Sequence, residues 1–145
     1  MTYLPDVNLW IALTVADHVH HTPAVNWFDA VSSDSIAFCR VTQMGFLRLL
    51  TNDRVMAEDV FTAQRAWQLI DHIRQDHRIV FTTEPLEIEL SWRTLTNAFK
   101  TGASFWTDSY LAAFVQATGH TLVTFDRGFS KHKRVSMQIL GSRSN

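Results

Sequence analysis

Apolar positions along the chain alternate between short runs of four or five residues and longer stretches in which they recur every three or four residues. The short runs are rich in β-branched and aromatic residues and predict strands, whereas the longer stretches predict amphipathic helices. The predicted strands cover residues 1–4, 35–39, 79–81, 122–125 and 137–140. The predicted helices cover residues 7–15, 23–31, 41–50, 57–75, 86–99 and 107–118.

Two helix ends carry local signals. Thr22 precedes Pro23, which predicts an N-cap followed by proline at the first helical position. Gly119 follows the last predicted helix at a typical C′ position. Strands that alternate with helices imply right-handed crossovers, so the pattern predicts one α/β domain over residues 1–145. It would contain a central, mainly parallel sheet of about five short strands with helices on both faces.

Composition is that of an ordinary globular protein, with 46% hydrophobic and 19% charged residues in 145. A chain of this length buries roughly 68–70% of its unfolded surface, so it folds without disulfides or a structural metal. The single cysteine, Cys39, forms no internal disulfide and is expected to be a buried structural residue, which favours a reducing cytoplasm. The chain shows neither a signal peptide at its start nor an apolar run of membrane-spanning length. We therefore expect a cytoplasmic protein with no membrane partner.

The formal net charge of −1 argues against a global field that attracts nucleic acid. The C-terminal stretch 127–145 is nevertheless basic, and no acidic residue follows Asp126. Its cations are Arg127, Lys131, Lys133, Arg134 and Arg143. Two interpretations stay open, a solvated and poorly ordered tail or a rim that contacts phosphates beside Asp126.

Three aspartates are the main candidates for chemistry. Asp6 follows the first predicted strand, Asp126 follows the strand at 122–125, and Asp108 lies at the start of the helix at 107–118. Active sites of parallel sheets lie at the carboxyl ends of the strands, so we expect these acids to converge at one edge. Each alone has another explanation, as a helix-capping acid or a turn residue. Convergent carboxylates would suit a hard divalent metal that prefers oxygen ligands, and metals of that kind catalyse phosphodiester chemistry.

Other polar residues carry weaker signals. Gln43 shares the apolar face of its predicted helix in the first turn, so it is expected either at the same edge or as a capping amide. Asn8 is a second oxygen or amide donor near Asp6, or a turn residue. The cluster of His18, His20 and His21 lacks zinc-site spacing and is interpreted as loop polarity. The scattered histidines, to which no role is assigned, are His72, His77, His120 and His132.

Four segments together resemble PIN-domain ribonucleases, in particular the VapC-type toxins of bacterial toxin–antitoxin pairs. They are residues 4–8 (Leu-Pro-Asp-Val-Asn), 42–50 (Thr-Gln-Met-Gly-Phe-Leu-Arg-Leu-Leu), 107–112 (Thr-Asp-Ser-Tyr-Leu-Ala) and 123–129 (Val-Thr-Phe-Asp-Arg-Gly-Phe). The resemblance implies that Asp6, Asp108 and Asp126 bind Mg²⁺ or Mn²⁺ and that RNA is cleaved endonucleolytically. Asn8 and Thr124 would support these acids.

The chain departs from the resembled pattern at Gln43, where the family commonly has a glutamate. An amide lacks the negative charge and cannot act as a base, so metal affinity and activity depend on what this position contributes. The site hypothesis therefore contains Asp6, Asp108, Asp126 and Gln43.

Three functions follow from these residues. The first is a metal-dependent endoribonuclease that holds backbone phosphates with Arg127, Lys131 and Lys133. The second, favoured by Gln43, is a catalytically weak PIN-like protein that binds RNA or a partner. The third is a phosphatase with Asp6 as nucleophile, although Asn8 stands where a second acid is normally required. Expected partners are RNA, a cognate antitoxin whose arginine enters the acidic pocket, and a second copy in a homodimer.

Overall fold

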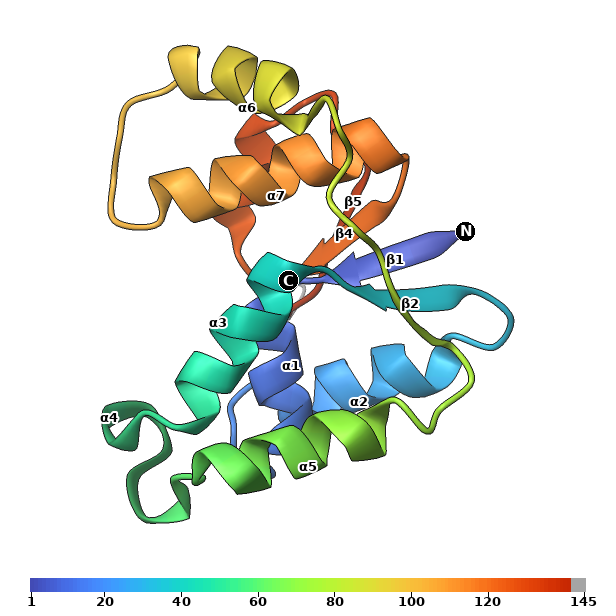
Figure 1. The fold of residues 1–145 in the computed structure, drawn as a ribbon, viewed down its shortest axis with the longest axis vertical. Coiled ribbons are helices and arrows are strands. Elements are labelled where there is room, and N and C mark those ends of the chain that lie inside the picture. Colours follow the sequence, from blue (N-terminus) through green and yellow to red (C-terminus); the bar gives the residue numbers. More distant parts are fainter. Residues whose placement is uncertain (142–145) are drawn as a thin grey trace.

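A computed structural model describes residues 1–141 (Figure 1); Arg143 of the predicted basic stretch lies outside them. The strands are β1 (Thr2–Pro5), β2 (Ser35–Phe38), β3 (Ile79–Phe81), β4 (Thr121–Thr124) and β5 (Met137–Ile139). The α-helices are α1 (Val7–Thr14), α2 (His21–Ala30), α3 (Arg40–Leu50), α4 (Asp53–Met56), α5 (Ala63–Ile73), α6 (Ile88–Asn97) and α7 (Phe105–Thr118). The two 3₁₀ turns are η1 (Ala57–Asp59) and η2 (Arg127–Lys131).

All five strands pair in parallel in the order β3-β2-β1-β4-β5, which confirms the predicted α/β class. The central strand β1 pairs with β2 on one side and with β4 on the other, with Leu4 opposite Leu122. Strand order therefore reverses between β1 and β4. In doubly wound sheets the crevice at this reversal, outside the carboxyl ends of the strands, is where ligands bind.

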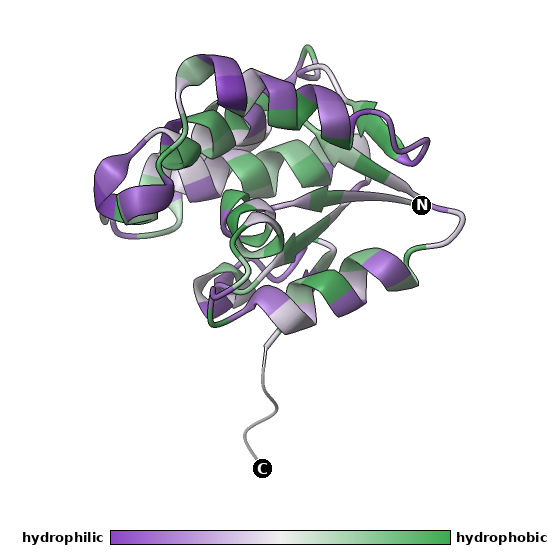
Figure 2. Cartoon of the chain, turned by 90° about the horizontal axis from the view of Figure 1, so that it is seen from below, coloured by the Kyte–Doolittle hydropathy of each residue, from purple (hydrophilic) through white to green (hydrophobic). Residues whose placement is uncertain are grey.

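Helices cover both faces of the sheet. The pair α6 and α7 lies on one face, and α1, α2, α3 and α5 lie on the other (Figure 1). Hydrophobic residues concentrate on the strands and on the helix faces turned toward them (Figure 2). On the larger side Trp10 stacks on Phe38 with ring centroids 4.1 Å apart. On the other side buried α7 residues and Phe129 of η2 share one apolar cluster, which fixes the segment after β4 against α7.

Close packing of α1 against α3 depends on Gly45. A Cβ atom placed on this glycine would lie 2.7 Å from Cγ2 of Val7, which is shorter than any acceptable contact. The two helices therefore pack closely because position 45 has no side chain. Since Val7 begins α1 and Gly45 lies in α3, this contact draws the start of α3 toward the end of β1.

The starts of α5 and α2 differ from the sequence predictions. The single helix predicted over 57–75 is wrong. Ala57 has φ +51°, which ends α4, and Thr62 begins α5 by accepting a hydrogen bond from the backbone N–H of Arg65. Thr22 is not an N-cap, because α2 begins at His21 and includes both Thr22 and Pro23.

Two other helix ends bear on the site. Gly119 caps α7 with φ +75°, as predicted. The same helix begins at Phe105, two residues before the predicted start. None of the helices in residues 1–141 combines the length and apolar character needed to cross a bilayer.

Candidate active site

Asp6 joins the end of β1 to the start of α1. Its Oδ1 accepts a hydrogen bond of 2.7 Å from the backbone N–H of Val7, which is the capping role considered from the sequence. Its Oδ2 accepts a second bond, 2.9 Å long, from the Thr124 hydroxyl at the end of β4. The side chain is only 7% exposed. Asp6 is therefore held rigidly at the point where strand order reverses.

Asp126 lies on the neighbouring strand end and is exposed. It is also the turn residue that the sequence suggested, because its Oδ1 accepts a bond of 2.8 Å from the backbone N–H of Gly128. Its own backbone N–H donates to the Thr124 hydroxyl over 3.0 Å. Thr124 thus bridges the two acids, donating to Asp6 and accepting from Asp126.

Asp108 has no comparable structural role. Because α7 begins earlier than predicted, the backbone N–H of Asp108 already bonds to Ser104 within the first turn. No donor among residues 1–141 forms a hydrogen bond with its half-buried carboxylate. Asp108 therefore forms no capping hydrogen bond, although it is the acidic residue in the first turn of α7, where the helix dipole favours a negative charge. A carboxylate that is partly buried and unpaired is costly unless it serves another purpose.

The three acids influence one another's pKa values. Burial, and then the charges of Asp6 and Asp126, raise the pKa of Asp108 to about 6, while Lys131 opposes the rise. Burial also raises the pKa of Asp6, against the hydrogen bonds from Thr124 and Val7, and the charge of Asp126 adds to the rise. Like charges raise one another's pKa only at short range. The charges of Asp6 and Asp126 therefore act on Asp108, and we call these three carboxylates the acidic edge; their convergence on one metal ion stays a prediction.

The donors of the acidic edge fit a hard divalent cation in their chemistry, since all are carboxylate oxygens that repel one another. A cation between them would relieve the repulsion recorded in the raised pKa values of Asp6 and Asp108. As placed, no three His, Cys, Asp or Glu side chains within residues 1–141 already converge in metal-binding geometry. Magnesium usually retains several water ligands, so direct contact with all three carboxylates is not required.

Gln43 is 2% exposed in the first turn of α3, just beyond the end of β2. Its Oε1 accepts a hydrogen bond from the guanidinium of Arg40, so the side chain does not cap the helix. The Arg40 guanidinium also lies 4.7 Å from the ring centroid of Phe81. The sequence predictions missed Arg40. Its position three residues before Gln43 places both on one helix face and was the available signal.

The remaining predicted residues lie around this edge. Asn8 is exposed in the first turn of α1, and its supporting role stays a prediction. Residues 127–131 form η2 and residues 137–139 form β5, so the interpretation as a poorly ordered tail is wrong for these two segments. Of the predicted phosphate contacts, Lys131 lies close enough to influence the pKa of Asp108, and Lys133 is exposed.

The interpretation of the early histidines as loop polarity agrees with the positions of His18 and His20 but is wrong for His21, which begins α2 and whose ring lies 2.7 Å from the Ala12 carbonyl oxygen. The backbone N–H of His20 donates to the ring of His18 over 3.0 Å. The ring of His20 stacks on Phe125 with centroids 4.3 Å apart. Cys39 is buried and free, as predicted, and burial raises the pKa of its thiol.

Comparisons with known proteins agree with this fold. The PIN domain family matches residues 3–135. Ribonuclease VapC41 of Mycobacterium tuberculosis is 35% identical over 142 residues, covering 94% of this chain and 97% of the relative.

Two solved structures share the fold. The crystal structure of VapBC2 from Rickettsia felis, bound to a DNA fragment from its promoter, superposes with a TM-score of 0.68 at 14% identity over 96% of this chain and 98% of that one. The structure of Mycobacterium tuberculosis VapC20, described as a sarcin–ricin loop cleaving toxin, superposes with a TM-score of 0.66 at 19% identity. The match covers 89% of this chain and 93% of that one. The matches over nearly the full length establish that the chain belongs to the PIN-domain family and, within it, to the VapC ribonucleases.

Proposed function

We propose that this protein hydrolyses RNA phosphodiester bonds endonucleolytically at the acidic edge, with Mg²⁺ or Mn²⁺ as cofactor, and acts as the toxin of a toxin–antitoxin pair. The observation that carries the proposal is the electrostatic coupling of Asp6, Asp108 and Asp126, which come from three distant segments. Their position at the reversal of strand order is where such a fold binds its ligand.

The three aspartates would hold the cation. When bound, it supplies acidification of the attacking water and stabilisation of the charge that develops on the phosphoryl oxygens. Thr124 orients two of the acids, since it hydrogen-bonds the Asp6 carboxylate and the Asp126 backbone. Asp108 is available as a ligand once it has lost its proton, which occurs above pH of about 6.

The basic residues next to the acidic edge would position the RNA. Lys131 ends η2 and Lys133 follows it, while Arg127 begins the same turn directly after Asp126. Contacts of such residues to backbone phosphates fix the register of the strand without reading its sequence. The amide nitrogen of Gln43 keeps two N–H donors, because only its oxygen is engaged by Arg40.

Replacement of Asp108 tests the proposal. Asp108→Asn should abolish Mn²⁺-dependent cleavage of a structured RNA hairpin, measured under single-turnover conditions, because the neutral amide binds the cation poorly. Asp71→Asn, an exposed substitution on α5, is the control and should cleave like the wild type. Unchanged cleavage by Asp108→Asn would sink the proposal. The sarcin–ricin loop, the target in the description of VapC20, is a suitable first hairpin.

The weak-binding alternative retains one supporting observation, the contact between Gln43 and Arg40. In this contact the Arg40 guanidinium lies beside the Gln43 amide. A glutamate at position 43 would instead add a negative charge to the site, and the amide does not. The phosphatase alternative loses support, because both oxygens of Asp6 accept hydrogen bonds and the side chain is almost fully buried. A nucleophile must instead be presented to its substrate.

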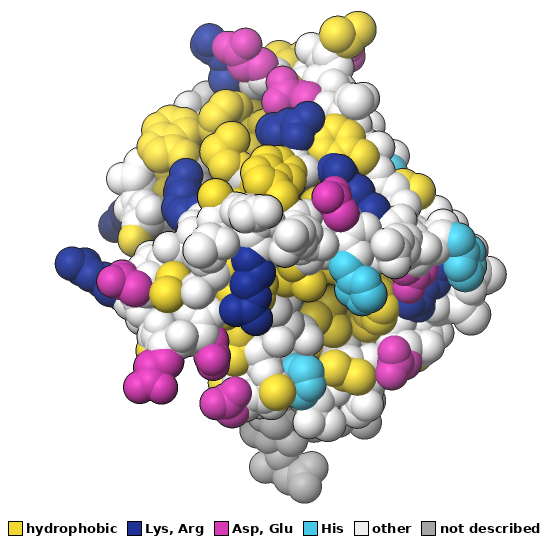
Figure 3. Space-filling view, turned by 60° about the horizontal axis from the view of Figure 1, so that its bottom comes forward, with side chains coloured by type: hydrophobic (Ala, Val, Ile, Leu, Met, Phe, Trp, Pro, Cys, Tyr) yellow, Lys and Arg dark blue, Asp and Glu magenta, His cyan; other side chains and the backbone are white. Residues whose placement is uncertain are grey.

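The partners belong to the same proposal. We expect a cognate antitoxin that inserts an arginine between the carboxylates, since a guanidinium pairs with such groups bidentately. The VapBC2 structure, bound to promoter DNA, is the supporting comparison. We also propose that the protein forms a homodimer and is located in the cytoplasm. Hydrophobic side chains lie beside Lys and Arg side chains on one face (Figure 3), and Trp67 and Trp106 are about half exposed, at 48% and 60%.

A further inference from the structure

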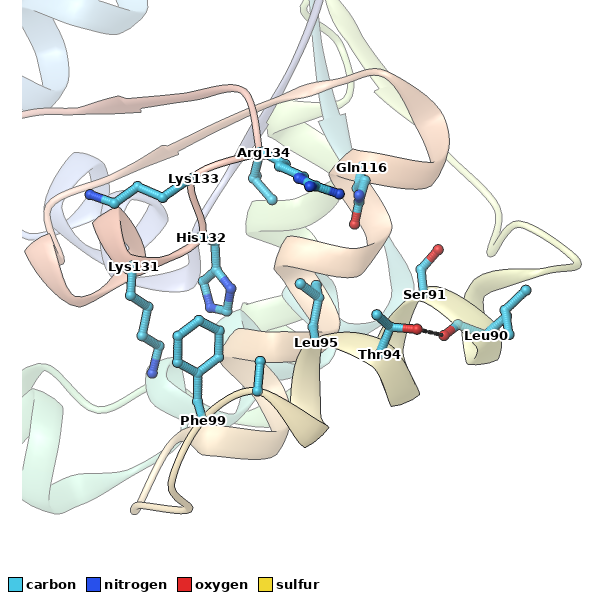
Figure 4. Close-up of a pocket in the computed structure, with 12 residues that line it drawn as sticks. Leu90, Ser91, Thr94, Leu95, Phe99, Gln116, Lys131, His132, Lys133 and Arg134 are labelled. Carbon is cyan, nitrogen blue, oxygen red and sulfur yellow. Dashed lines mark hydrogen bonds between the residues drawn. The ribbon is translucent and has the colours of Figure 1, made fainter.

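A cavity lies between α6, α7 and the segment that joins η2 to β5 (Figure 4). Its volume is about 430 Å³, within the usual range of roughly 300–1,000 Å³ for small-ligand pockets. One wall is apolar and contains Leu95, Phe99 and Val135. The opposite rim is cationic and contains Lys131, Lys133 and Arg134. We call this cavity the α6–α7 pocket.

His132 is the unusual residue of the α6–α7 pocket. It is only 3% exposed, and neither ring nitrogen has a hydrogen-bond partner among the described residues. Buried polar atoms are almost always satisfied, so a ring with two orphaned nitrogens points to a missing ligand. The imidazole is directed toward Phe99, with ring centroids 5.1 Å apart and planes at 79° (Figure 4).

The protonation state of His132 narrows the class of ligand. Burial, and then the charge of Lys131, lower the pKa of the imidazole, which favours its neutral form. A neutral imidazole offers one N–H donor and one acceptor, which suits the edge of a nucleobase. A bare phosphate would gain nothing from the apolar wall. A purely apolar ligand would leave the cationic rim without a partner.

Lys131 connects the pocket to the acidic edge. Its ammonium lies 5.1 Å from the ring centroid of Phe99, and its charge acts on both His132 and Asp108. The side chain is exposed and rests on the aromatic ring by a weak cation–π contact. It can therefore turn toward a phosphate. One lysine thus lies between the acidic edge and a pocket that accepts a base.

We propose that the α6–α7 pocket binds one unstacked nucleotide of the RNA substrate, adjacent to the cleaved phosphodiester. The base would lie against Phe99 and Leu95 and hydrogen-bond to His132, while its phosphate contacts the cationic rim. This inference rests on the proposed ribonuclease function. Proteins that recognise single-stranded RNA commonly stack unpaired bases on aromatic side chains and hydrogen-bond their edges.

Binding is tested first, without divalent metal so that the RNA stays intact. Histidine ring ¹⁵N signals of the wild-type protein are recorded with a structured RNA in EDTA, and His132→Phe identifies the His132 signals by their loss. We expect the His132 signals to shift with RNA, and to shift much less with an RNA that is abasic at one loop position. His132 signals that respond identically to intact RNA and to every abasic RNA would overturn the proposal.

Cleavage provides the second test, with RNAs abasic at single positions on either side of the cut. For the wild type, one position should lower kcat/KM about tenfold, the scale of a lost base–aromatic contact. His132→Phe should show the same loss on intact RNA and no further loss on that abasic RNA. His120→Phe is the matched control, because His120 is also partly buried but bonds to Thr82 outside the pocket, and it should behave like the wild type.

The outcomes separate the two proposals. If the wild type cleaves none of the RNAs with Mn²⁺, the proposed function fails, whereas the ring signals in EDTA still decide whether the pocket binds a base. If His132→Phe and the abasic site each lower kcat/KM independently, so that their effects multiply, the proposal of a base-binding pocket would be overturned. If His132→Phe fails to fold, as judged by circular dichroism, uniform tolerance of abasic sites by the wild type would overturn it.

Discussion

At the scale of single residues, Asp108 differs from the other two acids because nothing in the fold requires it. Asp6 caps α1 and Asp126 closes a turn, so each also contributes to structure. Asp108 caps nothing, and its pKa is raised from 3.8 to about 6. The folded protein therefore holds this proton more tightly than the unfolded chain. The free energy of unfolding of the protein therefore falls as pH rises from about 4 to above 6. Above that pH Asp108 is ionised, and the protein bears the full cost of its partly buried charge.

Asp108→Asn should consequently stabilise the protein while it removes activity. Without metal, we expect the free energy of unfolding at pH 7.5 to rise by on the order of 1 kcal/mol, allowing for solvent screening, and the gain to be much smaller at pH 4. Denaturant unfolding in EDTA at both pH values measures this. Asp76→Asn should show the opposite sign, because its hydrogen bonds and charge pairing with Arg78 lower the pKa of Asp76 to about 2. That variant should be destabilised at both pH values. Destabilisation of Asp108→Asn at pH 7.5 would contradict the assignment.

Gln43→Glu distinguishes the nuclease from the weak-binding alternative. Since Arg40 already contacts the amide oxygen, it would pair with the new carboxylate and offset most of its charge. We expect the apparent Mn²⁺ affinity to rise by less than about tenfold and the single-turnover rate to change little. Met44→Glu, an exposed position on the same helix, is the control for added charge. A rate gain of a hundredfold or more would instead indicate a site disabled by the amide.

Residue types and order predicted the three acids, Gln43 and Thr124 as members of one edge. Thr124 does bond to Asp6 and to Asp126, whereas the place of Gln43 in that edge stays a prediction. Residue types and order were insufficient for Arg40 and His132, whose significance depends on what lies beside them. An arginine near a glutamine is ordinary until its guanidinium is found on that amide. A lone histidine in a basic stretch carries no signal until both its nitrogens prove to be buried without partners.

At the scale of elements, sequence periodicity predicted whether a segment is a helix or a strand better than it predicted where the segment begins and ends. The apolar stripe over residues 60–73 continued the pattern of α5 backwards through a segment that is not α-helical. Competing local chemistry ended it, because Thr62 caps α5 and Ala57 adopts a positive φ. Positive φ at an alanine has no signature in a hydrophobic pattern, since glycine is the residue normally expected there.

Ala57→Gly should therefore stabilise the protein. The φ of +51° with ψ of −124° is unfavourable for any residue with a Cβ, and glycine relieves it. We expect a gain of about 1 kcal/mol in the free energy of unfolding, reduced by the greater freedom of glycine in the unfolded chain. Ala117→Gly, in the last turns of α7, should lose roughly 0.5–1 kcal/mol and serves as the control. Equal losses in both variants would show that Ala57 is unstrained.

At the scale of the whole molecule, alternation of strands and helices predicted a parallel sheet with helices on both faces. It did not predict strand order, because right-handed crossovers permit several orders for five strands. The observed order places β1 between β2 and β4, which brings the segments after these three strands to adjacent positions. The acidic edge is thus a product of topology, and the resemblance in motif order anticipated it.

Charge is also a property of the whole molecule, and here it is uneven. With a net charge of −1, RNA binding must depend on the local cations after Asp126. Lys133→Ala should weaken RNA binding regardless of sequence and reduce the slope of log affinity against log salt by about 0.7, the value for one single-strand phosphate contact. Fluorescence anisotropy in EDTA over a salt series measures both. Arg74→Ala, at the end of α5 on the other face of the sheet, should leave the slope unchanged. An unchanged slope in Lys133→Ala would remove it from the interface.

The contact between Gly45 and Val7 has a genetic consequence. Any side chain at position 45 would have to displace the Val7 side chain or move α3 away from α1, and with α3 the turn that carries Gln43. Cells that survive expression of the toxin without an antitoxin should therefore yield suppressor mutations at Gly45 as well as at the three aspartates. Suppressors at Gly45 would leave the charge of the acidic edge intact and weaken the toxin by degrees rather than eliminate it.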